Sequence, residues 1–172
     1  MTEEQLKARR MLSRFGLSLV VLGGIISLFG IYFLYVGNRS LSWPSVEGRL
    51  VSSSVKSREN NRATIRRGIK YYVSVKYKYD VDGKTYVSSR YSIGGGDRAS
   101  DLYPKRSQAE KQASKLFPPE SELTVYYDPK NPGSAILAPG LNLGTFAPLL
   151  IGIFFAGMGG LFNLILKKAT TS

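Results

Sequence analysis

The chain has 172 residues, a formal net charge of +12 at pH 7, and neither cysteine nor histidine. These absences exclude disulfide bonds, thiolate and imidazole metal ligands, cysteine nucleophiles and a serine-histidine-aspartate triad. Once two long apolar stretches and the short tails are set aside, about a hundred residues remain, which is the size of one folded domain.

The first predicted element is a membrane-spanning helix over residues 15–36, which carry no charged side chain. At about 1.5 Å per residue this helix would be about 33 Å long, enough to cross a hydrocarbon core of about 30 Å. It exceeds the apolar core of a signal peptide, about 7–15 residues, so we expect an uncleaved anchor. Residues 145–166 form a second uncharged stretch. The sequence therefore predicts two membrane spans with one domain, residues 37–144, between them.

Basic residues flank both predicted spans. Four lie in residues 1–14 and two in residues 167–172: Lys7, Arg9, Arg10, Arg14, Lys167 and Lys168. Short basic segments beside a span tend to stay in the cytoplasm, whereas long loops cross the membrane largely regardless of their charge. We therefore expect a multi-pass protein with both tails in the cytoplasm and residues 37–144 outside it. The reverse orientation stays open, because Arg39 and Arg49 reduce the contrast.

Small residues recur along each predicted span. Glycines seven residues apart keep nearly to one stripe of a helix in the first span, and small residues four apart in the second allow another backbone to approach closely. We expect these stripes to form a helix–helix contact, either within one chain or, as the alternative, in a homodimer. The residues are Gly16, Gly23 and Gly30 in the first span, and Gly152, Ala156 and Gly160 in the second.

The central domain opens with a predicted strand, residues 46–55, followed by a basic loop, residues 56–70, whose single acid is Glu59. The loop is a candidate surface for binding an anion or a partner. The alternative is a solvated hairpin tip without a ligand. The candidate binding residues are Lys56, Arg58, Arg62, Arg66, Arg67 and Lys70.

Apolar and polar side chains alternate along residues 71–81, which predicts a strand with one buried face. Asp82 and Gly83 follow and are suited to the positive φ angles of a tight hairpin turn, so residues 84–92 are predicted to return as a third strand. Turn chemistry explains Asp82 and the nearby Asp80 without a metal ion.

Ser107 and Glu110 form a capping box, which predicts a helix over residues 107–117. Its apolar side chains are spaced to pack on the sheet: Ala109, Ala113, Leu116 and Phe117. Residues 122–127 and 134–137 predict two last strands. The predicted fold is thus two transmembrane helices flanking a small, mainly antiparallel β domain with one helix. Its β-β-β-α-β-β order is also that of an OB-like barrel.

Three groups of residues in the central domain form a family pattern. They are a Trp and a Gly near the first strand, a Y-x-Y-x-V-x-G hairpin, and a late V-Y-Y-D-P-x-N-P element. In this chain they are Trp43 and Gly48, then Tyr77, Tyr79, Val81 and Gly83, then Val125, Tyr126, Tyr127, Asp128, Pro129, Asn131 and Pro132. With this pattern the chain resembles the bacterial "domain of unknown function 3592" family. One departure is Glu120-Ser121-Glu122, where the family usually has a Gly just before the late strand.

The resemblance implies a membrane-anchored β-rich domain, here in the inner membrane of a bacterium, with no agreed activity. We expect no enzyme, because no motif sets a nucleophile or an acid against a base, and we predict no catalytic, cofactor or metal residue. The preferred function is a non-enzymatic binding module in the lipid bilayer, which engages an anionic envelope component, another membrane or envelope protein, or a second copy.

The alternative function is a nucleic-acid-binding OB-like domain that faces the cytoplasm. In it, tyrosines of the second strand would stack on bases beside two lysines. These residues are Tyr71, Tyr72, Tyr77 and Tyr79, with Lys76 and Lys78. A packed sheet face explains the same tyrosines, so nucleic acid is the less favoured partner.

Overall fold

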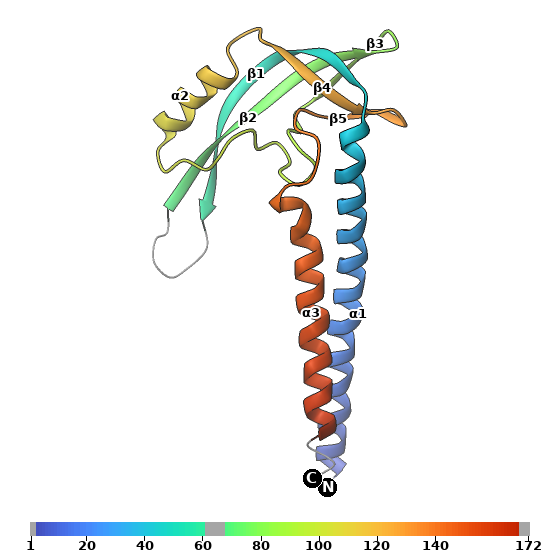
Figure 1. Cartoon of the computed structure of the whole chain (residues 1–172). Coiled ribbons are helices and arrows are strands. Elements are labelled where there is room, and N and C mark those ends of the chain that lie inside the picture. The colour runs from blue at the N-terminus through green and yellow to red at the C-terminus, as the bar shows by residue number, and fades with distance from the viewer. Residues whose placement is uncertain (1–2, 61–67, 169–172) are drawn as a thin grey trace. The chain divides into compact units, whose positions relative to one another are not determined.

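A computed structural model describes residues 3–60 and 68–168 of the chain, which divides into two compact units (Figure 1). The first unit, Met1–Tyr35 with Gly144–Ser172, is here called the helix unit. The second, Val36–Leu143, is called the β domain. The division agrees with the predicted order of one domain between two apolar helices.

The helix unit is formed by α1 (Glu3–Arg39) and α3 (Leu143–Lys168), both long and apolar enough to cross a membrane. They run antiparallel, so the start of α1 lies beside the end of α3, where an Arg9 Nη atom donates to the Leu166 carbonyl at 3.3 Å. The helix begins well before the predicted span. Residues 3–14 contain no Gly or Pro, and acidic Glu3 and Glu4 favour a helix start.

The β domain contains one five-stranded antiparallel sheet with the strand order β3-β2-β1-β4-β5 (Figure 1). Its strands are β1 (Ser45–Asn60), β2 (Gly68–Val81), β3 (Lys84–Ser88), β4 (Glu122–Asp128) and β5 (Asn131–Ile136). The Asp82-Gly83 turn is confirmed, because both residues have positive φ, 51° and 75°. The third strand is shorter than predicted and ends at Ser88.

The loop predicted over residues 56–70 is wrong for residues 56–60 and 68–70, which belong to β1 and β2, whereas residues 61–67 lie outside the described residues. β1 and β2 stay paired as far as Asn60↔Gly68. We call this long pair of strands the hairpin arm. Sequence reasoning missed this extension because the polar and charged side chains there do not alternate with apolar ones. An exposed ladder needs no buried face, only cross-strand backbone pairing.

Tyrosine and valine side chains of β2 form the centre of the core, where Tyr77, Val73 and Val125 are fully buried. We call this side of the sheet the inner face and the other side the outer face. Successive side chains of a strand point to opposite faces, so the predicted alternation in β2 is confirmed over Val75–Val81.

Helix α2 (Arg106–Leu116) packs against β1 and β2 and contributes Ala109 and Ala113 to the buried side of the domain. The predicted capping box is wrong, since the N-cap is Lys105 and makes no side-chain cap hydrogen bond. Leu116 is exposed, whereas Phe117 is buried, because the chain leaves the helix after Leu116 and turns the Phe117 ring inward.

The sheet is not closed, so the expected OB-like barrel is only partly present. Among the described residues no ladder joins the edge strands β3 and β5. Past their ends, Tyr91 O accepts backbone hydrogen bonds from Leu137 and Ala138 at 3.0 and 2.8 Å.

Candidate functional site

The structure describes three of the six candidate binding residues, Lys56, Arg58 and Lys70. The other three, Arg62, Arg66 and Arg67, lie outside the described residues. The three described cations all belong to the hairpin arm of β1 and β2 rather than to a loop.

Arg58 and Lys70 are direct cross-strand partners in the register of β1 and β2. Their side chains share the outer face, and opposite residues of an antiparallel pair have Cβ atoms about 5 Å apart. Within the part of the chain that the structure describes, neither forms an ion pair. Like charges in this position repel, so the pair destabilises the bare hairpin and favours an anion placed between the two side chains.

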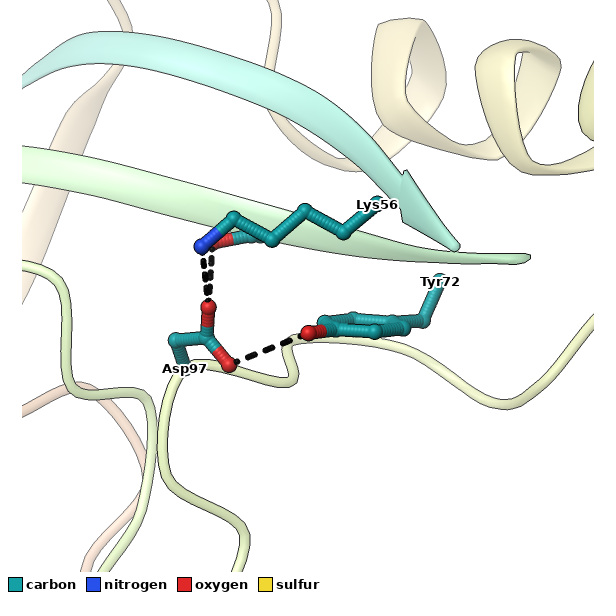
Figure 2. A network of polar contacts seen from close by, with 4 residues as sticks. Lys56, Tyr72 and Asp97 are labelled. Carbon is teal, nitrogen blue, oxygen red and sulfur yellow. Dashed lines mark hydrogen bonds and ion pairs between the residues drawn. The ribbon is translucent and has the colours of Figure 1, made fainter. Parts of the chain in front are cut away.

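Lys56 lies on the same face, opposite Tyr72, and is bound to an internal carboxylate (Figure 2). Its Nζ atom is 2.5 Å from Asp97 Oδ2. The same oxygen accepts a hydrogen bond from Ser74 Oγ at 3.0 Å, and Tyr72 Oη donates to Oδ1 at a longer 3.5 Å. Asp97 therefore accepts hydrogen bonds from the Lys56, Ser74 and Tyr72 side chains on this part of the outer face.

Both ionisable groups of this contact have shifted pKa values. The hydrogen bond to Asp97 raises the pKa of Lys56. Burial acts to raise the pKa of Asp97, but the hydrogen bonds from Lys56 and Ser74 outweigh it, so that pKa is lowered. The contact is thus a pair of full charges at neutral pH, and Lys56 has its counter-ion within the chain.

The backbone of the segment between β3 and α2 places Asp97 on this face. Ala99 N donates to Val73 O at 2.8 Å, and Tyr71 and Tyr103 exchange two backbone hydrogen bonds of 2.9 and 2.7 Å. The segment therefore extends the sheet along the free edge of β2. The sequence gives no local sign of this, because Asp97 lies 41 residues from Lys56.

Of the four tyrosines in the nucleic-acid alternative, Tyr77 and Tyr79 are buried, whereas Tyr71 and Tyr72 are half-buried. Tyr77 and Tyr79 are buried on the inner face, where their hydroxyls donate to Arg90 O at 2.8 Å and Pro132 O at 2.6 Å. Burial raises the pKa of Tyr77 to about 12. Lys76 and Lys78 are exposed on the opposite face, so these rings cannot stack bases beside those lysines.

The family described as Domain of unknown function (DUF3592) matches residues 46–142, which is more than half of the chain. The chain belongs to this family. The matched residues all lie in the β domain, which is therefore the DUF3592 domain of this protein. A comparison with curated proteins gives no match. The family carries no activity in its description, so the function has to be argued from the structure.

The backbone explains the residue types at two positions of the DUF3592 domain, Gly48 and Glu120. A β-carbon on Gly48 would stand 2.6 Å from Val125 Cγ2 and 2.9 Å from the Lys78 carbonyl oxygen, so only glycine fits there. Glu120, in the segment just before β4, adopts a positive φ of 62°. Glycine adopts this conformation at lower cost than glutamate does.

Outside the DUF3592 domain, Gly16, Gly23 and Gly30 of α1 lie against α3. A β-carbon on Gly23 would stand 2.6 Å from the Gly152 carbonyl oxygen and closer still to the backbone of Ala156. Gly30 meets Leu149 in the same way. The two helices therefore approach through their backbones, with the small residues at the contact.

The prediction for Gly160 differs from the structure. Among the described residues, no atom of another structural element lies within 4 Å of a β-carbon placed on Gly160, whereas one on Gly159 would stand 2.5 Å from the Gly16 carbonyl oxygen. Steps of four residues from Gly152 lead to Ala156 and Gly160. A helix has about 3.6 residues per turn, so steps of three and four must alternate, and the contact continues at Gly159.

The sequence reasoning also missed Asn163, a polar residue of this contact. A β-carbon on Gly16 would stand 2.8 Å from Asn163 Cγ. With its amide oriented so that both groups are satisfied, Nδ2 donates to Ser13 O and Oδ1 accepts from Leu17 N, both at 3.2 Å. Asn163 thus links α3 to the backbone of α1. A single Asn in an apolar stretch gives no sign of which backbone groups it will meet.

Proposed function

We propose that this chain is a non-enzymatic binding protein of a bacterial inner membrane. In this proposal α1 and α3 cross the bilayer, the DUF3592 domain lies outside the cytoplasm, and the pair Arg58–Lys70 binds an anionic partner. The partner chemistry is a phosphate-rich polyanion, either a soluble polymer or a lipid headgroup.

The exposed side chains of the helix unit support the membrane part of the proposal. Large apolar residues face outward on both helices, for example Leu28 with 68% and Phe154 with 64% exposure. Only 11% of the most apolar window of each helix is buried, whereas the core helix of a soluble protein is mostly buried. Exposing this much apolar surface to water is unfavourable, and lipid removes that cost. The close contact of α1 with α3 also favours a retained anchor over a cleaved signal sequence.

The observation that carries the binding part is the like-charged register pair Arg58↔Lys70. A hairpin gains nothing in stability from two opposed cations, whereas a bound phosphate converts their repulsion into two charge-assisted hydrogen bonds. Arginine also offers a planar fork that matches phosphate oxygens. The absence of histidine and cysteine from the sequence supports a role without catalysis.

The test uses the full chain in nanodiscs of neutral lipid. Two probes are compared: inorganic polyphosphate, and vesicles that contain an anionic phospholipid. We expect binding of at least one probe that weakens as NaCl is raised. The double variant Arg58→Ser/Lys70→Ser should weaken that binding about tenfold, which corresponds to about 1.4 kcal/mol.

A matched control removes the same charge elsewhere. Lys84→Ser/Lys130→Ser changes two exposed lysines at the opposite end of the sheet, beside the β2–β3 and β4–β5 turns. This control should retain binding. Equal losses in both double variants, or no binding of either probe by the unchanged chain, would contradict the proposal.

A further inference from the structure

The outer face of the hairpin arm presents its donors in successive rows. Arg58↔Lys70 is followed by Lys56↔Tyr72 and then by Ser54↔Ser74. Rows of one face are two residues apart along a strand, which is about 7 Å. Lys56 therefore lies directly beside the Arg58–Lys70 pair, and the three cations could contact neighbouring phosphates of one chain.

One of these cations is already occupied. The Asp97 carboxylate receives the Lys56 ammonium, the Ser74 hydroxyl and the Tyr72 hydroxyl, which are the donors that an external phosphate or carboxylate would use (Figure 2). Ser74 is 3% exposed, so its hydroxyl is held in place toward this carboxylate. Asp97 thus acts as an anion supplied by the chain itself.

The contact remains open to competition from solution. The Lys56 and Asp97 side chains keep 49% and 31% of their surfaces accessible. Asp97 follows a glycine-rich turn, in which Gly96 has a positive φ of 62° and exchanges backbone hydrogen bonds with Ser92. An exposed ion pair of this kind is worth at most about 1 kcal/mol, so an anion with several charges can displace it.

We propose that Asp97 is an intrachain inhibitor of the anion site: it occupies Lys56 and leaves a two-cation site, and its displacement creates a three-cation site for a phosphate-rich polyanion. This inference rests on the proposed function, because it assumes that Arg58 and Lys70 bind that polyanion. It adds a means of regulation, since polyanions with closely spaced phosphates can engage all three cations and compete with Asp97, whereas single phosphates cannot.

The test measures polyphosphate binding by the full chain in neutral nanodiscs. Asp97→Asn should tighten binding about three- to tenfold and steepen its salt dependence by about one counterion, because one more cation takes part. Lys56→Ser alone should change little. In the double variant Lys56→Ser/Asp97→Asn the gain should disappear. Unchanged binding by Asp97→Asn, or a gain that persists without Lys56, would overturn the inference.

Two further variants separate the role of the Asp97 carboxylate from an effect of net charge alone. Asp101→Asn removes the same charge from an exposed residue of the same segment, and an equal gain there would overturn the inference in favour of net charge. Ser74→Ala removes one hydrogen bond to Asp97 without changing charge, and it should give a smaller gain in the same direction. Thermal unfolding of each variant verifies that the domain is folded.

The outcomes distinguish this inference from the proposed function. If Arg58→Ser/Lys70→Ser weakens binding but Asp97→Asn does not tighten it, the binding site stands and the inhibition by Asp97 is wrong. If the unchanged chain binds neither probe, the proposed function is wrong. A tighter complex of Asp97→Asn with polyphosphate but not with anionic vesicles assigns the phosphates to a soluble polymer, and the reverse result assigns them to lipid headgroups.

Discussion

Large apolar side chains face outward in the helix unit and inward in the DUF3592 domain. In the helix unit, glycines and Asn163 lie at the contact, and large apolar residues such as Leu28 face outward. In the DUF3592 domain, Tyr77 and its neighbours are buried and charged residues face outward. Packing by small residues is how helices associate in lipid, whereas burial of large apolar side chains stabilises domains in water. Each unit is therefore suited to a different solvent.

The largest predicted effect is that of Tyr77→Ala. Tyr77 is fully buried, so the change should lower the free energy of unfolding of the DUF3592 domain by about 3–5 kcal/mol and leave the helix unit intact. Denaturation followed by the fluorescence of Trp43, the single tryptophan of the chain, and by helical circular dichroism separates the two units. Tyr77→Phe is the control and loses only the hydrogen bond to Arg90, worth about 1 kcal/mol. Loss of both units together would contradict their independence.

The second prediction concerns two adjacent glycines of α1. Gly23→Leu forces a side chain into the backbone of α3 and should weaken the helix pair by about 1–3 kcal/mol. No described residue of another element lies within 4 Å of a β-carbon on Gly24, so Gly24→Leu should be tolerated. Because the chain has no cysteine, Phe15→Cys and Phe162→Cys, whose rings are 6.4 Å apart, can report pairing by disulfide trapping. Equal trapping in both leucine variants would show that the close approach is wrong.

The third prediction concerns the positive φ of Glu120. Glu120→Gly should stabilise the DUF3592 domain by about 1 kcal/mol, because glycine lacks the β-carbon that disfavours this conformation. Glu122→Gly is the matched control: it lies in β4, where glycine has too much freedom, and should destabilise the domain. Chemical denaturation measures both, and shifts of the same sign would contradict the explanation.

The smallest predicted effect is the pH dependence of the contact between Lys56 and Asp97. The pKa of Asp97 is lowered in the folded state, so its stabilisation is present above the ordinary carboxyl pKa and is lost as the pH falls through the folded value. Because both side chains are partly exposed, the effect should not exceed about 1 kcal/mol. The difference in stability between the unchanged chain and Asp97→Asn should therefore shrink from pH about 6 to about 3. A stability difference that grows as the pH falls would contradict the predicted direction of the pH dependence.

What the sequence predicts well depends on local signals. The two apolar helices, the alternation along β2 and the Asp82-Gly83 turn each arise from neighbouring residues, and all are present in the structure. The capping-box prediction failed because the N-cap is Lys105 instead of Ser107, and the N-cap position depends on how the preceding chain enters the helix. The prediction of an OB-like barrel was only partly right, because the order of elements alone does not establish a β3–β5 ladder.

The site was less predictable than the fold. The basic residues of the hairpin are visible in the sequence, but their opposition in the register Arg58↔Lys70 depends on β1 and β2 continuing through polar residues. Asp97 and Asn163 were missed because their partners lie far away in the chain. Contacts of this kind depend on tertiary structure, and no periodicity in the sequence reports them.

Labelling of single cysteines with a membrane-impermeant maleimide tests the central claim most directly. The chain has no cysteine of its own, so Ser57→Cys on the hairpin arm and Glu4→Cys at the start of α1 each give one reactive site. In intact cells that produce the full chain, we predict labelling of Ser57→Cys, while Glu4→Cys reacts only after the membrane is permeabilised. Labelling of Ser57→Cys only after permeabilisation would contradict the account, because the anion site would then face the cytoplasm.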